Sequence, residues 1–373
     1  MDPDTPGENA REAVPGKEPR DRDPGNQTGY AVREGTLPED SEAILALWDL
    51  SFEALRGSAG RDRLGWLYGD ENPAGEGRLM LLEDESGRPV GFKGLGTRAF
   101  SLRGKESLGA IMADFTVHPE HRSLGPALHL LRETMTRGRR GFGFLYGFPN
   151  PSAEAVFKRA GLRPVALLRR YGHPLRSRKF LRGRVPDFVA AAMAPFVDFA
   201  LFVESAVARL LSSLRFRVDE PDGFDDRFDG LWKETPGLSI LTGTRSRAAL
   251  QWRFQDVPKP DRISVITAES RKSGELRGYV VWRSRGSQAH VMDVFSAGDP
   301  AVVTGLLRTV RWKARRRGCE ALSLEFAGPP SLEEAVRRAG FLRREANPLY
   351  FVQGDEDAVD PDADWYLTSF DRD

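Results

Sequence analysis

The sequence predicts an α/β protein with two tandem domains, each a twisted mixed sheet flanked by helices. A chain of 373 residues with 40% hydrophobic side chains is long enough for two domains and can supply two cores. Short runs of β-forming residues alternate with segments whose apolar residues recur at helical spacing. Landmarks of the first half also return in the second half at nearly constant offsets. We therefore expect one architecture to occur twice.

The repeat is specific in residue type and in spacing. A tryptophan motif with Trp66 at its centre returns 186 residues later around Trp252. A pair of hairpin glycines returns at an offset of 187 residues. Three further features recur at an offset of 179 residues: Asp114 and Asp293, segments 151–154 and 330–333, and segments 159–161 and 338–340. Such constant offsets indicate a tandem duplication.

The first domain can be predicted element by element. Residues 30–33 favour a strand, and the acidic start at 38–40 followed by Ile44, Leu47 and Trp48 predicts a helix. The later elements are, in order, a hairpin (78–83 and 87–93), a strand (115–117), a helix (127–135) and a last helix with its closing turn (150–162).

Composition divides the rest of the chain. Residues 1–28 lack aromatic side chains and predict a disordered tail without a signal peptide, and residues 29–175 form the first predicted domain. Residues 176–222 are expected to be a basic, amphipathic helical connector, which packs on both domains in preference to lying on an anionic membrane. Residues 223–373 form the second predicted domain.

The segment from Asp114 to Ala127 is the most informative in the chain. Phe115, Thr116 and Val117 favour a strand that ends at a His-Pro turn. Arg122 then supplies a cation, followed by Ser123 and Leu124. Gly125 allows a close approach of the backbone, and Pro126 suits the first position of a helix. The open N-terminus of that helix predicts a site for phosphate.

This segment resembles the pyrophosphate loop of the GNAT superfamily of acyl-CoA-dependent N-acyltransferases, and the surrounding elements of residues 30–175 match that family in order and spacing. The resemblance implies acetyl-CoA or another acyl-CoA as co-substrate. It implies that the main chain of Phe115 to Val117 pairs with the pantetheine arm. The amides from Arg122 to Ala127 would hold the pyrophosphate, and Asn150 would add a polar contact.

One departure from the family pattern concerns catalysis. The family places a tyrosine acid seven residues after Asn150, where this chain has Phe157. Tyr146 or Tyr171 is a candidate substitute, and an unassisted thiolate is a tolerable leaving group. Asp114 is the leading candidate for the base that receives the amine proton. Since Asp293 repeats it, Asp114 has a structural interpretation too, and Glu83, Asp84 and Glu85 are further candidates.

The second copy differs at the positions of the anion loop. At the 179-residue offset the loop residues and Asn150 are replaced by Ala301, Thr304, Leu306 and Pro329. We therefore expect one acyl-CoA site, in the first domain. The second domain would then be a scaffold or a wall of the acceptor pocket.

The resemblance, to tandem bacterial members in particular, implies acyl transfer by direct attack of an amine on the thioester. The acceptor would be a small molecule or amino sugar. Two alternatives stay open: an aminoacyl-tRNA-dependent transferase of the peptide-bridge type, and a non-catalytic module that binds acyl-CoA. The sequence does not define the acceptor, the acyl length or the oligomeric state.

Composition argues against other classes of function. A net charge of +1 gives no drive toward nucleic acid, and no apolar run is long enough for a spanning helix, so we expect a cytoplasmic protein. The single Cys319 opens a strand-like run and is expected in the core. His118 and His121 lack an evident third ligand, so no metal is expected.

Overall fold

The elements that the sequence predicts in the first half all form, and the structure adds a helix at residues 58–68 and strands at 144–147 and 164–174 that were not assigned from the sequence. The computed structural model describes residues 29–102, 105–177, 215–234, 240–258, 262–355 and 364–372, with scattered helical positions between 188 and 206. The first half comprises β1 (Ala31–Gly35), α1 (Ser41–Ser51), α2 (Ser58–Tyr68), β2 (Arg78–Glu83), β3 (Pro89–Leu102), β4 (Lys105–Val117), the short η2 (Pro119–His121), α3 (Leu124–Gly138), β5 (Phe144–Gly147), α4 (Pro151–Arg159) and β6 (Pro164–Pro174).

The second half follows nearly the same order. It comprises β7 (Phe216–Asp219), α7 (Asp226–Lys233), β8 (Ile240–Gly243), α8 (Arg247–Phe254), β9 (Ile263–Ser270), β10 (Leu276–Arg285), β11 (Gln288–Ser296), α9 (Pro300–Arg316), β12 (Ala321–Ala327), α10 (Pro330–Arg338), β13 (Leu342–Gln353) and β14 (Asp364–Thr368). Gly161 and Gly340, which follow α4 and α10, have φ values of 90° and 89°. These left-handed positions explain why both turns carry glycine.

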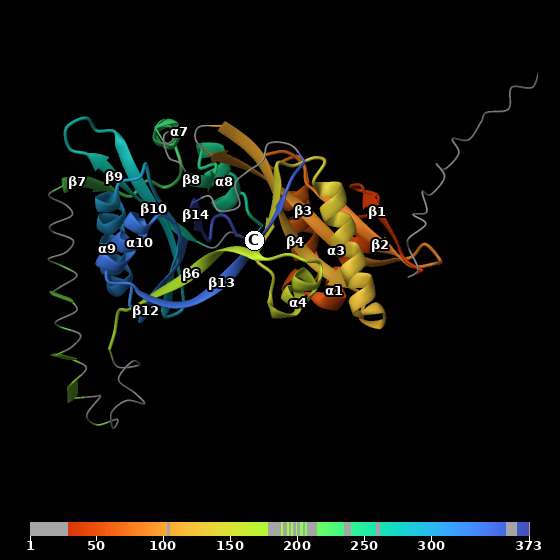
Figure 1. Cartoon of the computed structure of the whole chain (residues 1–373). Coiled ribbons are helices and arrows are strands. Elements are labelled where there is room, and N and C mark those ends of the chain that lie inside the picture. The colour runs from red at the N-terminus through yellow and green to blue at the C-terminus, as the bar shows by residue number, and fades with distance from the viewer. Residues whose placement is uncertain are drawn as a thin grey trace, which may run out of the picture.

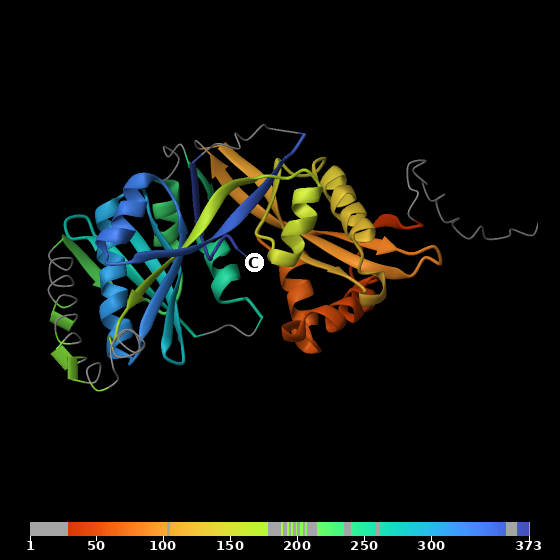
Figure 2. The same cartoon turned by 60° about the horizontal axis from the view of Figure 1, so that its bottom comes forward.

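The sheet is continuous, which the sequence did not predict. In the described ranges it has fourteen strands, which include the path β1-β2-β3-β4-β5-β13-β6-β12-β11-β10-β9-β7. The strand that follows the last helix of each half therefore reaches across: β6, after α4, pairs with β12, and β13, after α10, pairs with β5. Figures 1 and 2 show β6 and β13 side by side where the two halves meet, with the C-terminus between the halves. The exchange gives each of these strands a partner on both edges.

Helices cover both faces of the first half's sheet. Along β2, Leu79 and Leu81 lie in one hydrophobic core with residues of α1 and α2. Met80 and Leu82 lie in the other core, with residues of α3 and α4. This alternation is the two-residue period of a strand that is buried on both faces. It gives the mixed α/β architecture that the sequence predicts.

Predictions made for segments outside the site can also be compared with the structure. Phe216–Asp219 fall inside the predicted connector but form β7, which pairs with β9. The predicted tail and most of the connector lie outside the described residues. Cys319 is buried in the core of the second half, as predicted, and burial raises the pKa of its thiol. Among the helices described, none has the length and apolar character needed to cross a membrane.

Candidate functional site

The loop between β4 and α3 leaves the start of the helix open. Ser123 is the N-cap residue, but its side chain makes no capping hydrogen bond. A Cβ atom on Gly125 would meet no atom within 4 Å. Helix α3 begins at Leu124, so Pro126 occupies its third position and not the predicted first. The missing N–H still costs nothing there, because the first four amides have no partner within the helix.

Arg122 is turned back onto the end of β4. Its Nε donates to the carbonyl of Val117 at 2.9 Å, and its Nη2 donates to Ser51 Oγ at 2.9 Å. Ser51, the last residue of α1, lies 2.5 Å from Thr116 Oγ1. The amides of Arg122 and Ser123 donate to the carbonyls of Pro119 and His121. These contacts fix the loop, and they leave the amides of Leu124 and Gly125 at the open end of α3.

Strands β4 and β5 pair only over a short stretch and then diverge. Gly109, Ala110 and Ile111 pair with residues 144–146, whereas β4 continues to Val117. On its other edge β4 stays paired with β3 to its end. The edge of β4 beyond Ile111 therefore lacks a strand partner among the described residues. An extended polar chain can pair with such an edge.

A β-bulge interrupts β4 within this free edge. Ala113 pairs with Gly94 and Thr116 pairs with Phe92, so Asp114 and Phe115 together oppose Lys93. Asp114 has φ of 50°, a left-handed value that is uncommon for a residue other than glycine. Both of its carboxylate oxygens accept from Arg63 Nε, at 3.1 and 3.0 Å, and Tyr68 donates to Oδ2 at 2.8 Å. The carboxylate thus anchors the bulge to α2.

Helix α4 presents Phe157 where the family pattern has tyrosine. Asn150 caps α4, and its side chain accepts from the amide of Ala153 at 2.9 Å. Phe157 is buried and packs edge-to-face on Tyr350 of β13, with ring centroids 5.5 Å apart. The hydroxyl of Tyr350 donates to Glu154 at 2.9 Å. Burial, and then this hydrogen bond, raise the pKa of Tyr350 to about 12.

The two tyrosines predicted as substitutes lie in the cores. Tyr146 is fully buried at the last position of β5 that pairs with β4, and its hydroxyl donates to the carbonyl of Asp371 at 3.0 Å. Tyr171 lies on β6 in the core of the second half, and burial raises its pKa. Glu83 accepts from Arg33 at 2.7 Å. Hydrogen bonds from Ser86 and the neighbouring amides lower the pKa of Asp84 to about 2.

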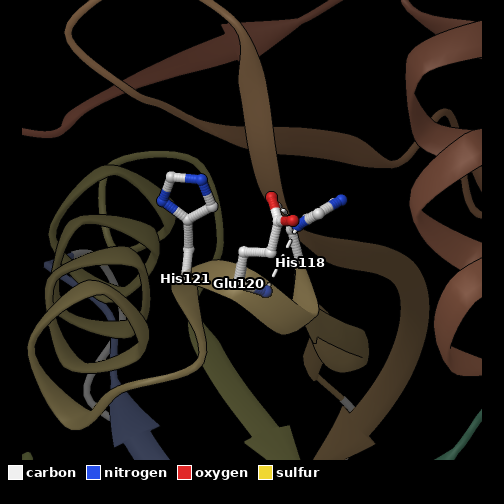
Figure 3. Close-up of side chains that lie close together, drawn as sticks. All are labelled: His118, Glu120 and His121. Atoms are coloured by element: carbon white, nitrogen blue, oxygen red, sulfur yellow. Dashed lines mark hydrogen bonds and ion pairs between the residues drawn. The ribbon is translucent and has the colours of Figure 1, made fainter.

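His118, Glu120 and His121 bring potential metal-ligand atoms within 4.8 Å of one another. Figure 3 shows Glu120 beside His118, with the ring of His121 apart from both. The ring nitrogens of His121 already lie within hydrogen-bond distance of Tyr30, at 2.8 Å, and of Arg88, at 3.1 Å. A metal ion would have to displace one of these partners. The absence of a metal site remains a prediction.

The equivalent region of the second half is closed. Asp299 caps α9 and accepts from the amides of Ala301 and Val302. Its carboxylate therefore occupies the place where an anion would bind. Beyond the last pair of β11 with β12, β14 pairs with Phe326 and Ala327 of β12. Tyr366 of β14 also donates to a carbonyl of β11. The chain's own last strand thus fills the second divergence.

Two residues at the first site could not be predicted from local sequence. Lys93 is 2% exposed, and its Nζ lies 5.0 Å from the ring centroid of Phe115 and 5.4 Å from that of Phe157. Tyr350 reaches α4 only because β13 crosses to the first half. Neither contact follows from local sequence, because both depend on how distant strands align.

Comparison with known proteins identifies the fold. No family model matches the sequence, and no curated protein matches it. A conserved Enterococcus faecalis V583 protein described as a probable N-acyltransferase has a TM-score of 0.59 and 11% identity, over 87% of this chain and 72% of its own. A GCN5-related N-acetyltransferase from Kribbella flavida has a TM-score of 0.56 and 13% identity, over 88% and 72%.

A third solved structure shares the architecture. Saccharomyces cerevisiae N-myristoyltransferase with bound myristoyl-CoA has a TM-score of 0.50 and 12% identity, over 89% of this chain and 84% of its own. All three comparisons extend over both halves of the chain. The protein therefore has the fold of the GCN5-related N-acetyltransferases, the GNAT superfamily.

Proposed function

We propose that the protein transfers an acyl group, in the first instance acetyl, from acyl-CoA to the amine of a small molecule. The observation that carries this proposal is the asymmetry between the halves. In the first half the edge of β4 that faces β5 has no strand partner beyond Ile111 within the described part of the chain, and the start of α3 is open at Gly125. In the second half β14 and Asp299 occupy the corresponding places. One acyl-CoA site per chain follows.

The proposed cofactor site runs from α3 to the divergence of the strands. The amides of Leu124 and Gly125, with Ser123 and Ala127 beside them, would hold the pyrophosphate at the positive end of the helix. Arg122 would add charge from the base of the loop. The pantetheine would pair with β4 from Phe115 to Val117, and Asn150 would complete the polar wall. The myristoyl-CoA bound by the yeast neighbour supports an acyl-CoA co-substrate but does not define the acyl length.

In the proposed reaction the acceptor amine attacks the thioester of acyl-CoA directly. The amine nitrogen bonds to the thioester carbonyl carbon, the C–S bond breaks, and the nitrogen loses a proton as the thiolate gains one. For the proton to the thiolate we propose Tyr350, because it packs on Phe157 and its raised pKa keeps the hydroxyl protonated at neutral pH. Tyr146 is the second candidate, and its hydroxyl would first have to leave the carbonyl of Asp371.

For Asp114 the arrangement supports a positioning role better than the role of a base. Its oxygens already accept from Arg63 and Tyr68. Asp293 repeats this pattern in the closed half, where it is bonded by Arg245 and Tyr279. A carboxylate that recurs where no cofactor is expected has a structural role in both halves. As a base, Asp114 would have to exchange one of these donors for the substrate amine.

The test is calorimetric titration of the full chain with acetyl-CoA. Gly125→Glu places a carboxylate at the open start of α3 and should weaken binding at least tenfold through repulsion of the pyrophosphate. Gly230→Glu is the matched control, because Gly230 also lies in a helix and has no atom within 4 Å of its Cβ position. Equal binding by both variants would refute the site. If the wild-type protein bound neither acetyl-CoA nor longer acyl-CoAs, the proposed function would be refuted.

Phe157 gives specific support to one alternative, a module that binds acyl-CoA without turnover. Free-thiol release from acetyl-CoA with a panel of amines separates the two. Tight binding without release of thiol for any amine, amino sugars included, would favour the module. Release that depends on the amine would establish the transferase and begin to define its acceptor.

A further inference from the structure

A second site lies where the two halves meet. A cavity of about 60 Å³ is bounded by β3, by the chain around β8 and α8, and by the C-terminal residues. Its walls include Arg98 and Phe100 of the first half, and Thr244, Trp252 and Asp371 of the second. Strands β3 and β8 pair beside it, at Phe100 and Gly243. Both halves thus contribute to one small enclosure.

The cavity is separate from the proposed acyl-CoA site. Arg98 lies five residues beyond Lys93 on β3, a separation of about 16 Å at about 3.3 Å per residue. Lys93 faces the bulge of β4, beside the open edge proposed for pantetheine. A ligand in the cavity would therefore not reach the thioester, so this inference goes beyond the proposed function.

Buried polar atoms without partners concentrate around this cavity. Eleven buried side-chain nitrogen or oxygen atoms in the described part of the chain form no hydrogen bond. Four of them belong to three residues of this one wall: Nε and Nη2 of Arg98, Oγ1 of Thr244 and Oδ1 of Asp371. Buried polar atoms are normally bonded to protein or to a bound molecule. Their convergence is the mark of a built binding site.

The two atoms of Arg98 define the first recognition element. Nε and Nη2 lie on the same edge of the guanidinium, where two parallel N–H groups match the two oxygens of a carboxylate. Arg98 is 6% exposed, and its guanidinium carbon lies 4.4 Å from the ring centroid of Trp252. This stacking holds the guanidinium in place. A fixed, buried fork with both donors unused is suited to a bidentate anion.

The opposite wall offers acceptors. Asp371 uses Oδ2 to accept from Arg245 at 2.6 Å and from the amide of Thr368 at 2.9 Å, which fixes the carboxyl group. Its Oδ1 lies so close to Gly243 that a Cβ there would come within 2.3 Å. Because residue 243 is glycine and has no Cβ atom, Oδ1 of Asp371 can occupy this place in the cavity wall. The hydroxyl of Thr244 can accept a hydrogen bond beside it.

We propose that this cavity binds a small amino carboxylate, whose carboxylate lies on the Nε–Nη2 edge of Arg98 and whose ammonium faces Thr244 and Asp371. The carboxyl groups of Asp293 and Asp371 share one guanidinium, that of Arg245, so an ammonium group beside Oδ1 of Asp371 would meet an acceptor that makes no other hydrogen bond to the residues that the structure describes. A cavity of about 60 Å³ has room for about four or five water-sized spheres of about 10–15 Å³ each, so a ligand of about five heavy atoms, the size of glycine, fits.

Equilibrium dialysis of the full chain against labelled glycine, up to about 10 mM, tests the proposal. We expect one glycine per chain, displaced by acetate or methylamine at least tenfold less well than by unlabelled glycine. Saturable binding is required, and its absence over this range would overturn the proposal. Displacement by acetate as effective as by glycine would overturn the assignment of an amino carboxylate.

Variants assign the binding to this cavity. Arg98→Met keeps the stem over Trp252 but removes the fork, so it should weaken glycine binding at least tenfold. Arg317→Met is the matched control, since Arg317 stacks on another tryptophan, Trp282, at 4.3 Å. Thr244→Val removes only one acceptor and should weaken binding severalfold in a folded protein. Unchanged binding by either cavity variant, or loss in the control, would contradict the proposal.

Discussion

The indole rings of Trp66 and Trp252 stack with centroids 4.6 Å apart and planes 16° from parallel. Each indole N–H donates to the main-chain carbonyl of the other residue, at 3.0 and 3.2 Å. The two residues hold equivalent positions on α2 and α8, 186 residues apart. The halves therefore meet through the same face of each, in the self-complementary manner of a two-fold interface. Both tryptophans therefore serve packing at the junction of the halves.

Truncation of either tryptophan should loosen the junction of the halves. Trp66→Ala and Trp252→Ala should each lower the free energy of unfolding by about 3–5 kcal/mol, because both rings are buried and well packed. The double variant should lose less than the sum, since the first truncation already removes the stack. Urea unfolding measures all three. Losses that add within about 0.5 kcal/mol would show that the two rings are not energetically coupled.

Asp293 and Asp114 should differ in their effect on stability. Asp293 and its partner Arg245 are both 0% exposed, so Asp293→Asn should cost about 3–5 kcal/mol by leaving a buried charge poorly compensated. Asp114→Asn should cost about 1 kcal/mol, because Arg63 is 19% exposed and water can replace part of the interaction. Denaturant midpoints compare the two. If Asp114→Asn abolished thiol release without loss of stability or of acetyl-CoA binding, Asp114 would be the base.

The parts of the site that local sequence encodes could be predicted. The β-formers before His118 end β4, and the uncapped helix with Gly125 follows from residue types within a few positions. The same holds for the turns at Gly161 and Gly340, where the backbone needs a left-handed residue. The same 179-residue offset separates these two turns and separates Asp114 from Asp293, which supports the tandem origin that we propose.

The arrangement of the strands could not be predicted. Nothing in the pattern of β6 or β13 states which edge each will pair with, because a strand's alternation fixes its faces and not its neighbour. The pairing of β13 with β5 places Tyr350 against Phe157. The filling of the second divergence by β14 is likewise non-local. The cavity at Arg98 draws on segments from both halves. Such sites follow from tertiary alignment, which a single sequence leaves open.

Stability should depend on His290 in mildly acidic solution. Burial, and then the nearby Arg283, Arg170 and Arg285, lower the pKa of His290 from 6.5. The unfolded chain therefore takes up a proton at a higher pH than the folded one, so stability falls as pH drops through 6.5 toward the folded pKa. His290→Asn should remove this component from thermal midpoints measured between about pH 8 and 5.5. An identical pH profile in the variant would exclude His290 as its source.

Removal of the Tyr350 hydroxyl should slow acyl transfer without weakening the binding of acetyl-CoA. Tyr350→Phe keeps the contact with Phe157 but removes the proposed donor, so kcat should fall by about 10²-fold if proton transfer to the thiolate contributes as usual. Tyr171→Phe is the control, since Tyr171 lies in the core of the second half and should leave kcat unchanged. Thiol release at saturating acetyl-CoA, with binding measured separately, gives both quantities. Normal turnover in Tyr350→Phe but not in Tyr146→Phe would transfer the role to Tyr146. Normal turnover in both would mean that the thiolate leaves without a protein acid, because a thiol with a pKa of about 8.5 needs little help.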